Sequence, residues 1–420
     1  MGLSANDSAA GIEAQMSVLS EMNSFIHSNP EVSSKEVKAH DHFVEVLKRL
    51  DVKVTPHAYD VYTSFKAEYG EGGRLVVFNA EYDALPGVGH ACGHNLIATA
   101  SFAGFLGAVA ALKKAGPGTK GRVTLMGTPA EEAGGGKIKL IKGGAYKDVA
   151  ACLMVHPAPL SSLQAAAADA LDGNDASGVS GVAKIRLLAC IKYAVSFKGR
   201  EAHAAMSPWA GVNALDAVCL AYNGISMLRQ QIHPNERIHG VFREAGDQAN
   251  VTPAHTSVVY HMRSDTLAHA ETLWQRVKNC FDGAATATGC TVDYEPIDTY
   301  AEQRSSPGLC QAYVDAMPKG TVLYTTPTDF MTASTDMGNV CYECPGFQGA
   351  FGIDAPPGAG NHTGDFTGAA GTDDAFQRAV ACGRGLAATA LKVLSDDKFA
   401  ASIKSAWQDD MKAAKKEHQG

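Results

Sequence analysis

Six side chains that can bind a divalent cation or accept a proton fall in short polar segments of this chain. They are the thiol, imidazole and carboxylate groups of Cys92, His94, Glu131, Glu132, His156 and His362. Such groups are the usual protein ligands of divalent transition metals. A hydrolytic site also needs a carboxylate that is not a ligand and can take a proton from water. Two adjacent glutamates at the end of a strand could divide these roles, so the set indicates a metal-dependent hydrolase.

Each of these residues taken alone has a simpler interpretation. A buried cysteine usually serves packing, a Glu-Glu pair usually faces solvent, and a His-Pro at a strand end is often a turn. The secondary structure predicted around these residues supports the interpretation that they form one site. Apolar runs typical of buried strands cover 74–80, 123–126 and 150–155, and a polar cluster follows each. With a helix predicted over 96–114, this alternation predicts an α/β sheet, whose ligand sites lie at the carboxyl ends of strands.

A second unit is expected in the middle of the chain, where the order strand–helix–strand–strand–helix–strand indicates a small α+β sandwich. Its strands are predicted at 193–197, 238–242, 257–262 and 291–296, and its helices at 213–230 and 268–281. Before it, residues 160–181 are rich in Ala, Ser, Asp and Gly, which predicts a loop or a loosely packed insertion. After it the α/β character resumes, with a helix over 372–394. We therefore expect a catalytic domain in two parts, 1–188 and 299–420, with an insert at 189–298.

Composition excludes several classes of function. A chain of 420 residues exceeds what one hydrophobic core usually supports, which agrees with two domains. A net charge of -8 disfavours nucleic acid as a partner. The N-terminus lacks a signal-peptide pattern and no membrane span is expected. The ten cysteines are scattered in apolar segments as reduced core residues would be, so a cytoplasmic location is expected.

These motifs resemble the M20 family of metallopeptidases, and within it the branch of aminobenzoyl-glutamate hydrolases, auxin-conjugate hydrolases and M20-domain dipeptidases. The matching text spans nearly the whole chain in order, at 81–86, 90–95, 131–136, 154–157, 197–205, 213–217, 250–253, 334–339 and 361–363. The resemblance implies a zinc-peptidase-like catalytic domain with a mixed sheet flanked by helices. It also implies an inserted ferredoxin-like lid domain that forms a homodimer.

The resemblance further implies a role for each site residue. The ligands of a centre of two divalent ions, with zinc expected and manganese, cobalt or nickel compatible, would be Cys92, His94, Glu132, His156 and His362. Glu131 matches the general base. His203 matches a histidine that reaches the site of the partner subunit and stabilises the oxyanion.

Three further residues carry implied roles in the same way. Asn250 and Arg263 match positions that hold the substrate, and the Arg263 fork suits a carboxylate. Asp83 matches the carboxylate that orients a ligating imidazole. The implied reaction is hydrolysis of the amide bond of a small dipeptide or N-acyl amino acid.

Three departures from the family pattern stand out, and two alternative functions remain open. Asn95 stands where many relatives have Asp, and residues 163–192 are longer and less regular than expected. Cys341 and Cys344 form a CxxC that is best interpreted as core packing or as an incidental surface pair. One alternative is a hydrolase that uses Cys92 as its nucleophile. The other is an inactive metal-binding scaffold, although Glu131 would have no use in one.

Overall fold

A computed structural model describes residues 2–171, 175–325, 330–331 and 333–417 of the chain. The chain folds into two compact units. The larger consists of Met1–Arg186, Gln303–Met331 and Asp336–Ala414, and the smaller of Leu187–Glu302 with Thr332–Thr335 and Lys415–Gly420. The insert predicted at 189–298 lies within Leu187–Glu302.

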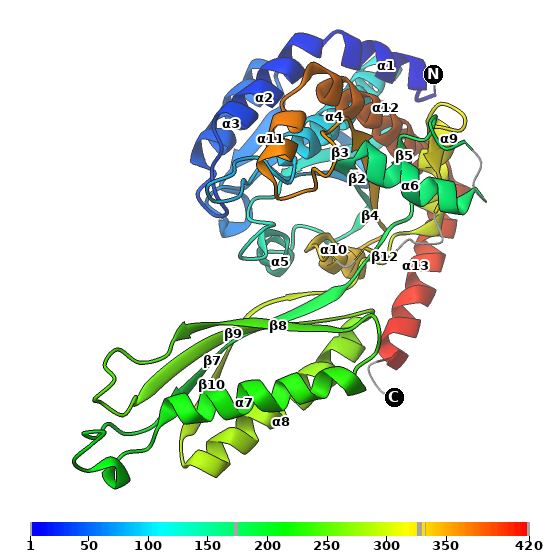
Figure 1. Ribbon diagram of the computed structural model, residues 1–420. Coiled ribbons are helices and arrows are strands. Elements are labelled where there is room, and N and C mark those ends of the chain that lie inside the picture. The colour runs from blue at the N-terminus through cyan, green and yellow to red at the C-terminus, as the bar shows by residue number, and fades with distance from the viewer. Residues whose placement is uncertain (1, 172–174, 326–329, 332, 418–420) are drawn as a thin grey trace. The chain divides into compact units, whose positions relative to one another are not determined.

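The larger unit, in which Figure 1 labels β2, β3, β4 and β5 among the surrounding helices, is built on a seven-stranded mixed sheet. Its strand order is β1-β2-β4-β13-β5-β11, with β3 paired to β2. The strands β2, β4 and β13 pair in parallel, whereas β1 is antiparallel to β2. The predicted strands 74–80, 123–126 and 150–155 fall within β2, β3 and β4, so the α/β prediction is confirmed. The strands are β1 (Lys53–Pro56), β2 (Phe65–Ala80), β3 (Lys120–Gly127), β4 (Val149–Pro159), β5 (Gly181–Val182), β11 (Val322–Leu323) and β13 (Gly346–Ile353).

The register of these strands brings the segments that follow β2 and β3 together. Residues 66–71 and 75–80 of β2 both pair with β3, because the chain reverses at Gly72 and Gly73, each with φ +57°. The last pair in this ladder joins Ala80 to Gly127. The acidic residues that come next in both segments therefore start from adjacent positions at one edge of the sheet.

Helix α4 forms the centre of the hydrophobic core of this unit. Its composition would permit a membrane span by length and hydropathy alone, but 94% of its apolar window is buried inside the protein. Small residues let neighbours approach closely, since a Cβ on Gly104 would lie 2.8 Å from the ring of Phe78. The helices of the unit are α1 (Ala5–Glu13), α2 (Met16–Ser28), α3 (Val37–Arg49), α4 (His94–Ala115), α5 (Gly136–Lys142), α6 (Leu160–Ala170), α9 (Pro307–Ala316), α10 (Met337–Glu343), α11 (Gly364–Ala370), α12 (Asp373–Ser395) and α13 (Asp397–Glu417), with a short 3₁₀ helix at Ala58–Asp60.

The prediction of a loop over 160–181 was wrong for its first half. Residues Leu160–Ala170 form helix α6, which buries Leu163 and Ala167. The segment carries five alanines between positions 165 and 170, and alanine has the highest intrinsic helix propensity, which outweighed the weak apolar periodicity. Residues 172–174 of this stretch lie outside the described residues.

The smaller unit is a four-stranded antiparallel sheet of order β10-β7-β9-β8, with α7 and α8 packed on one face (Figure 1). This order and the predicted strand–helix sequence are those of a ferredoxin-like fold. Two further strands, β6 (Arg186–Leu187) and β12 (Phe330–Met331), form a separate pair. The elements of the smaller unit are β7 (Ala189–Lys198), α7 (Ala214–Leu228), β8 (Arg237–Glu244), β9 (His255–Ser264), α8 (Leu267–Thr288) and β10 (Thr291–Tyr300), with short 3₁₀ helices at Pro208–Ala210 and Arg229–Gln231.

Candidate metal centre

The larger unit brings all five predicted ligands and Glu131 into one cluster. Three overlapping groups have ligand atoms within 4.8 Å of one another. The groups are Cys92–His94–His156, Cys92–Glu132–His362 and Glu81–His94–Glu131. The cluster lies at the carboxyl ends of β2 and β3, where the alternation of strands and polar segments predicted a ligand site.

A glycine between two ligands fixes the start of α4. Gly93 has φ +76°, and a Cβ on it would lie 2.6 Å from Cγ of Pro157. Any larger residue would be strained by this conformation and would also collide with β4. The Sγ atom of Cys92 is thereby held 3.4 Å from Nε2 of His156.

Two imidazole rings are oriented so that one nitrogen of each points into the cluster. Nδ1 of His94 lies 3.1 Å from Oδ1 of Asp83, and Nδ1 of His156 lies 2.8 Å from the carbonyl oxygen of Pro157. With its hydrogen on Nδ1, each ring offers the lone pair of Nε2 to a cation. Asp83 thus lies where the orienting carboxylate was predicted, and it also accepts from Ser33 Oγ at 2.8 Å and from the Glu132 N–H at 3.0 Å.

The atoms that converge in the cluster fit a divalent metal. Nε2 of His94 lies 3.5 Å from Oε2 of Glu81 and 3.8 Å from Oε1 of Glu132. All three atoms are buried and none makes a hydrogen bond to another described residue. Lone pairs brought this close repel one another unless a proton or a cation lies among them. Mixed sulfur, nitrogen and oxygen donors suit a divalent transition metal.

The electrostatic surroundings of the two adjacent glutamates differ. Burial raises the pKa of Glu131 well above its ordinary value, and the nearby carboxylates of Glu81, Asp336 and Glu132 raise it further. Burial also opposes ionisation of Glu132, but the contact with the His362 imidazole and the charge of His94 lower the pKa of Glu132 overall. Glu132 therefore ionises more readily than an ordinary glutamate, and Glu131 ionises less readily.

Burial also raises the pKa of the Cys92 thiol to about 12. A thiol with that pKa is a poor nucleophile at neutral pH, which argues against Cys92 as the attacking group. A coordinating thiol is deprotonated by the charge of the metal it binds. The site therefore has to release the Cys92 proton when a metal is bound through sulfur.

Two loops of the site hold non-glycine residues in left-handed conformations. Ala130 has φ +60° and His362 has φ +72°. The Ala130 N–H donates to Oε1 of the buried Glu36 at 2.8 Å, and the His362 N–H donates to the carbonyl of Ala91 at 2.7 Å. Such strain costs free energy and persists where surrounding contacts impose it, most often at functional sites.

Several buried charged residues of the site were given no role from the sequence. Glu81 belongs to a matched motif, and its position directly after a buried strand could have identified it. The other residues are far apart in sequence, and their separations match no known motif. They are Glu36, Lys137 and Asp336. Their contacts with the cluster appear only in the fold.

The other three predicted residues belong to the smaller unit and fall into two groups. His203 and Asn250 lie together, since His203 forms a β-bridge with Val251 and the Ala204 N–H donates to the Asn250 carbonyl at 3.0 Å. Nδ1 of His203 accepts from the N–H groups of Ala205 and Met206, both at 3.2 Å. Arg263 lies near the other end of β9 and donates from Nη1 to Ser334 Oγ at 2.9 Å.

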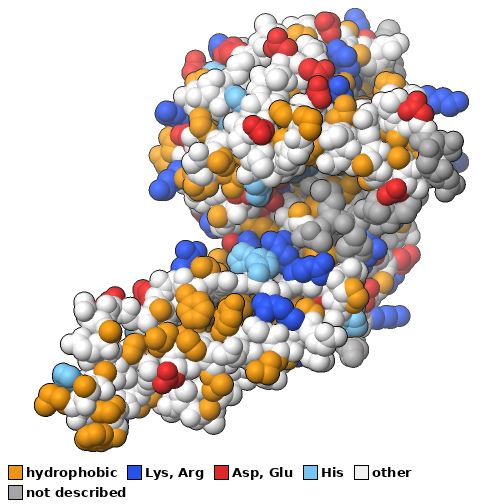
Figure 2. Space-filling model, in the orientation of Figure 1, with side chains coloured by type: hydrophobic (Ala, Val, Ile, Leu, Met, Phe, Trp, Pro, Cys, Tyr) orange, Lys and Arg blue, Asp and Glu red, His pale blue; other side chains and the backbone are white. Residues whose placement is uncertain are grey.

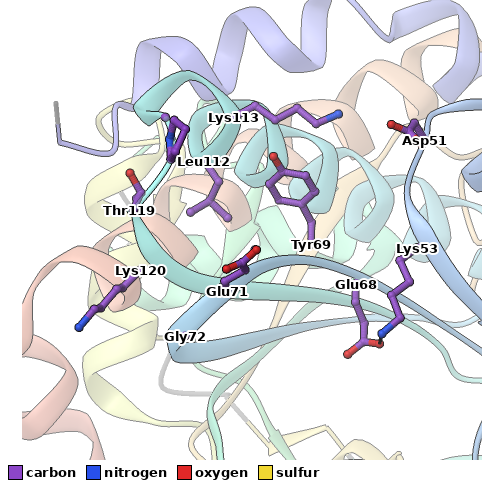
Figure 3. Close-up of a pocket in the computed structure, with 14 residues that line it drawn as sticks. Asp51, Lys53, Glu68, Tyr69, Glu71, Gly72, Leu112, Lys113, Thr119 and Lys120 are labelled. Atoms are coloured by element: carbon purple, nitrogen blue, oxygen red, sulfur yellow. Dashed lines mark ion pairs between the residues drawn. The ribbon is translucent and has the colours of Figure 1, made fainter.

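The larger unit also has a cavity of about 890 Å³ at the opposite end of β3. Figure 3 shows its lining, which includes Tyr69, Leu112 and Lys113, and an ion pair of 3.4 Å between Lys53 and Glu68. The described residues that line it include no histidine or cysteine. It therefore offers none of the imidazole or thiol groups that characterise the cluster.

The fold and the cluster define a metal-dependent hydrolase of the α/β class with a ferredoxin-like insert. Residues 77–387 match Peptidase family M20/M25/M40, and the chain belongs to this family. It is a hydrolase that acts on peptide or amide bonds.

Two curated relatives place the chain more closely within the family. It is 35% identical over 391 residues to the Xaa-Arg dipeptidase of Mus musculus, covering 90% of this chain and 85% of that protein. It is 31% identical over 300 residues to one of the subunits of the p-aminobenzoyl-glutamate hydrolase of Escherichia coli (strain K12), covering 67% of this chain and 58% of that one. The resemblance to the amidohydrolase and dipeptidase branch is therefore confirmed.

Solved structures share the fold. The aminobenzoyl-glutamate utilization protein of Klebsiella pneumoniae superposes with a TM-score of 0.67 at 17% identity, covering 92% of this chain and 98% of that one. A dinuclear metal-binding M20 peptidase of Bacillus subtilis superposes with a TM-score of 0.64 at 17% identity, covering 91% of this chain and 99% of that one.

Proposed function

We propose that this protein is a dipeptidase or amidohydrolase that holds two divalent metal ions, with zinc the expected metal, and cleaves the amide bond of a small dipeptide or N-acyl amino acid. The observation that carries the proposal is the convergence of the five ligands beside Glu131, a buried carboxyl outside the proposed ligand set. The printed names of the relatives, a dipeptidase and an aminobenzoyl-glutamate hydrolase, support this substrate class. An inactive scaffold would have no need for Glu131, and an activity screen of metal-supplemented protein against dipeptides and N-acyl amino acids distinguishes the two.

Glu131 is the proposed proton carrier. Divalent ions bound at the cluster would supply Lewis acidity for the scissile carbonyl and for the attacking water. Glu131 takes the proton of that water and later delivers it to the leaving amine. Burial and the neighbouring carboxylates raise the pKa of Glu131, and the positive charge of bound ions would oppose that rise, so that Glu131 can be ionised when it takes the proton from water.

His203 is the proposed donor to the oxyanion. Because Nδ1 of His203 accepts two backbone N–H groups, the neutral ring carries its hydrogen on Nε2. The Nε2–H group can therefore donate a hydrogen bond. A donor placed at a developing oxyanion typically contributes a factor of about 10²–10³ to the rate.

The smaller unit supports a site shared between two subunits. Asn250 and His203 lie before the start of β9, whereas Arg263 lies near its end. A strand rises about 3.3 Å per residue, so Arg263 is roughly 26 Å along β9 from His255. A small substrate cannot reach both ends, so we assign Arg263 to one active site and the His203–Asn250 pair to the site of a partner subunit.

An edge strand with exposed apolar side chains supports the homodimer. β8 is an edge of the four-stranded sheet, and 50% of Val241 and 37% of Phe242 are exposed. On the adjoining helix α7, Tyr222 packs against Phe242 with ring centroids 5.7 Å apart, and 43% of Tyr222 is exposed. Figure 2 shows hydrophobic side chains gathered over this unit. Pairing of two β8 strands about a two-fold axis would cover the edge and the apolar side chains together.

A mixing experiment tests the catalytic roles and the shared site together. Glu131→Gln and His203→Ala are each expected to be inactive as pure dimers with metal content intact. Their mixture should regain activity, because each heterodimer contains one site with both wild-type residues. Native mass spectrometry of tagged chains must show subunit exchange. If subunits exchange and the mixture stays inactive, His203 does not act in the partner's site.

A further inference from the structure

A buried lysine lies directly behind the metal-ligand cluster. Among the described residues, Lys137 is the only lysine or arginine that is buried, with 0% of its surface exposed. Its Nζ lies 2.5 Å from Oε1 of Glu81 and 2.5 Å from Oδ1 of Asp336. The Lys137 N–H also donates to Oδ2 of Asp336 at 2.9 Å. Asp336 therefore holds both the backbone and the side chain of Lys137.

The two oxygens of Glu81 have different surroundings. Oε1 contacts the Lys137 ammonium, whereas Oε2 lies 3.5 Å from Nε2 of His94, one of the proposed ligand atoms. Glu81, His94 and Glu131 also form one of the three groups whose ligand atoms lie within 4.8 Å of one another. One oxygen of Glu81 is thus bound to a fixed cation, and the other is directed into the cluster.

The backbone around Lys137 keeps this arrangement rigid. Gly136 precedes Lys137 at the start of α5, and a Cβ on Gly136 would lie 1.7 Å from the carbonyl oxygen of Pro129. Only glycine allows this approach, which holds α5 against the segment that carries Glu131. The ammonium therefore lies at a fixed place behind Glu131 and Glu81.

The charge of Lys137 has a specific use at this position. Burying the carboxylates of Glu81 and Asp336 without a cation would cost several kcal/mol. A covalently attached ammonium neutralises them whether or not metal is bound. It also occupies Oε1 of Glu81, so that Glu81 can offer only a single oxygen to the cluster.

We propose that Glu81 is a further residue of the metal centre, and that Lys137, clamped by Asp336, is the positioning residue that turns one Glu81 oxygen toward the ion at His94. The inference rests on the proposed function only in that a divalent ion binds among these residues. Zn²⁺ affinity measured on metal-free protein tests it without any catalytic turnover. A failure of the Glu131 or His203 assignments would therefore leave it standing.

The first test removes the charge of Glu81. In Glu81→Gln, Lys137 keeps Asp336 as its partner and the amide oxygen can still accept from Nζ, so the fold should hold. We expect Zn²⁺ affinity, measured by competition with a chromophoric chelator, to fall by about 10–100-fold. The exposed Lys139 on the same helix gives a matched control, and Lys139→Met should bind Zn²⁺ as the wild type does. Wild-type Zn²⁺ affinity in a folded Glu81→Gln variant would overturn the proposal.

The second test asks whether Lys137 acts through Glu81. Lys137→Met should lower kcat at saturating metal by at least about tenfold, with KM changed by less than about threefold, because the residue orients the centre rather than the substrate. When Glu81→Gln is already present, Lys137→Met should lower kcat by less than about a further threefold. An equal loss in both backgrounds would show that Lys137 is merely structural. If Lys137→Met does not fold, the double variant Lys137→Met/Asp336→Asn removes the opposing charges together. The loss of kcat in this double variant is then compared with and without Glu81→Gln.

Discussion

Asp83→Asn tests how far the orientation of His94 decides metal binding. The Asp83 carboxylate accepts from Nδ1 of His94 at 3.1 Å, Ser33 Oγ at 2.8 Å and the Glu132 N–H at 3.0 Å. Burial opposes the ionised form, but His94 and these hydrogen bonds hold the pKa of Asp83 well below its ordinary value. An asparagine side chain offers one acceptor and one donor group in the same space, so it cannot satisfy all three partners.

The two orientations of the amide have different costs. If its oxygen stays on His94, the amide NH₂ meets the Glu132 N–H and leaves that buried donor without an acceptor, at a cost of about 1–3 kcal/mol. If the amide is reversed, its NH₂ group faces Nδ1 of His94 and forces the ring hydrogen onto Nε2. That removes the lone pair that would bind the metal, so affinity should fall by about 10–100-fold.

Zn²⁺ competition and thermal unfolding of the metal-free protein measure these two effects separately. Ser33→Ala is the matched control, because it removes one donor to Asp83 and leaves the contact with His94 in place. It should lower stability slightly and leave Zn²⁺ affinity within about threefold of the wild type. An Asp83→Asn protein that binds Zn²⁺ as tightly as Ser33→Ala would refute the reasoning that Asp83 sets the orientation of His94.

Four further perturbations have definite expected outcomes. Glu131→Gln should keep its metal content and lose at least about a hundredfold in turnover, and near-normal turnover in a metal-replete sample would disprove its role as base. Zn²⁺ binding to the metal-free wild type should release the Cys92 proton near pH 7. Calorimetry in buffers of different ionisation enthalpy should show that Cys92→Ser releases about one proton fewer than the wild type when Zn²⁺ binds. This variant should also bind Zn²⁺ more weakly. Burial, followed by the charge of Asp83, raises the pKa of Glu36 from 4.5 to about 7, so the folded protein binds more protons than the unfolded chain between these values. The free energy of unfolding should therefore fall by up to about 3 kcal/mol as the pH rises through that window. Urea unfolding at the lower and upper pH of the window should show that the unfolding free energy of Glu36→Gln depends less on pH than that of the wild type. Phe242→Asp should weaken the dimer in sedimentation and lower activity in proportion, and an unchanged mass would remove β8 from the interface.

The sequence allowed the sheet and part of the cluster to be predicted for one physical reason, whereas the full set of five ligands, with His362, was implied by the resemblance to the M20 family. Buried parallel strands are continuous apolar runs, and the chain after each run has to emerge at the same edge of the sheet. That rule alone placed Glu131, Glu132 and His156 near one another. The ferredoxin-like insert was predictable in the same way from the order of its elements.

What the sequence did not reveal depends on contacts between distant segments. Lys137 lies in a short helix with Lys139 and Lys142, and its spacing is that of a solvent-facing lysine. Only the approach of Glu81 and Asp336, 56 residues before it and 199 residues after it, makes Lys137 a buried cation. Helix α6 was missed for a different reason, because an alanine-rich segment has high helix propensity without an apolar stripe.

The separation of His203 and Asn250 from Arg263 along β9 has a genetic consequence. If each active site takes residues from two copies, a chain that carries both Glu131→Gln and His203→Ala disables every dimer it enters. It spoils its own site through Glu131 and its partner's site through His203. In an equal mixture with wild-type chains, random pairing leaves only about one quarter of the dimers active, so activity falls to roughly a quarter instead of a half. Such an allele would be dominant-negative, whereas chains that each carry one of the two substitutions would complement each other.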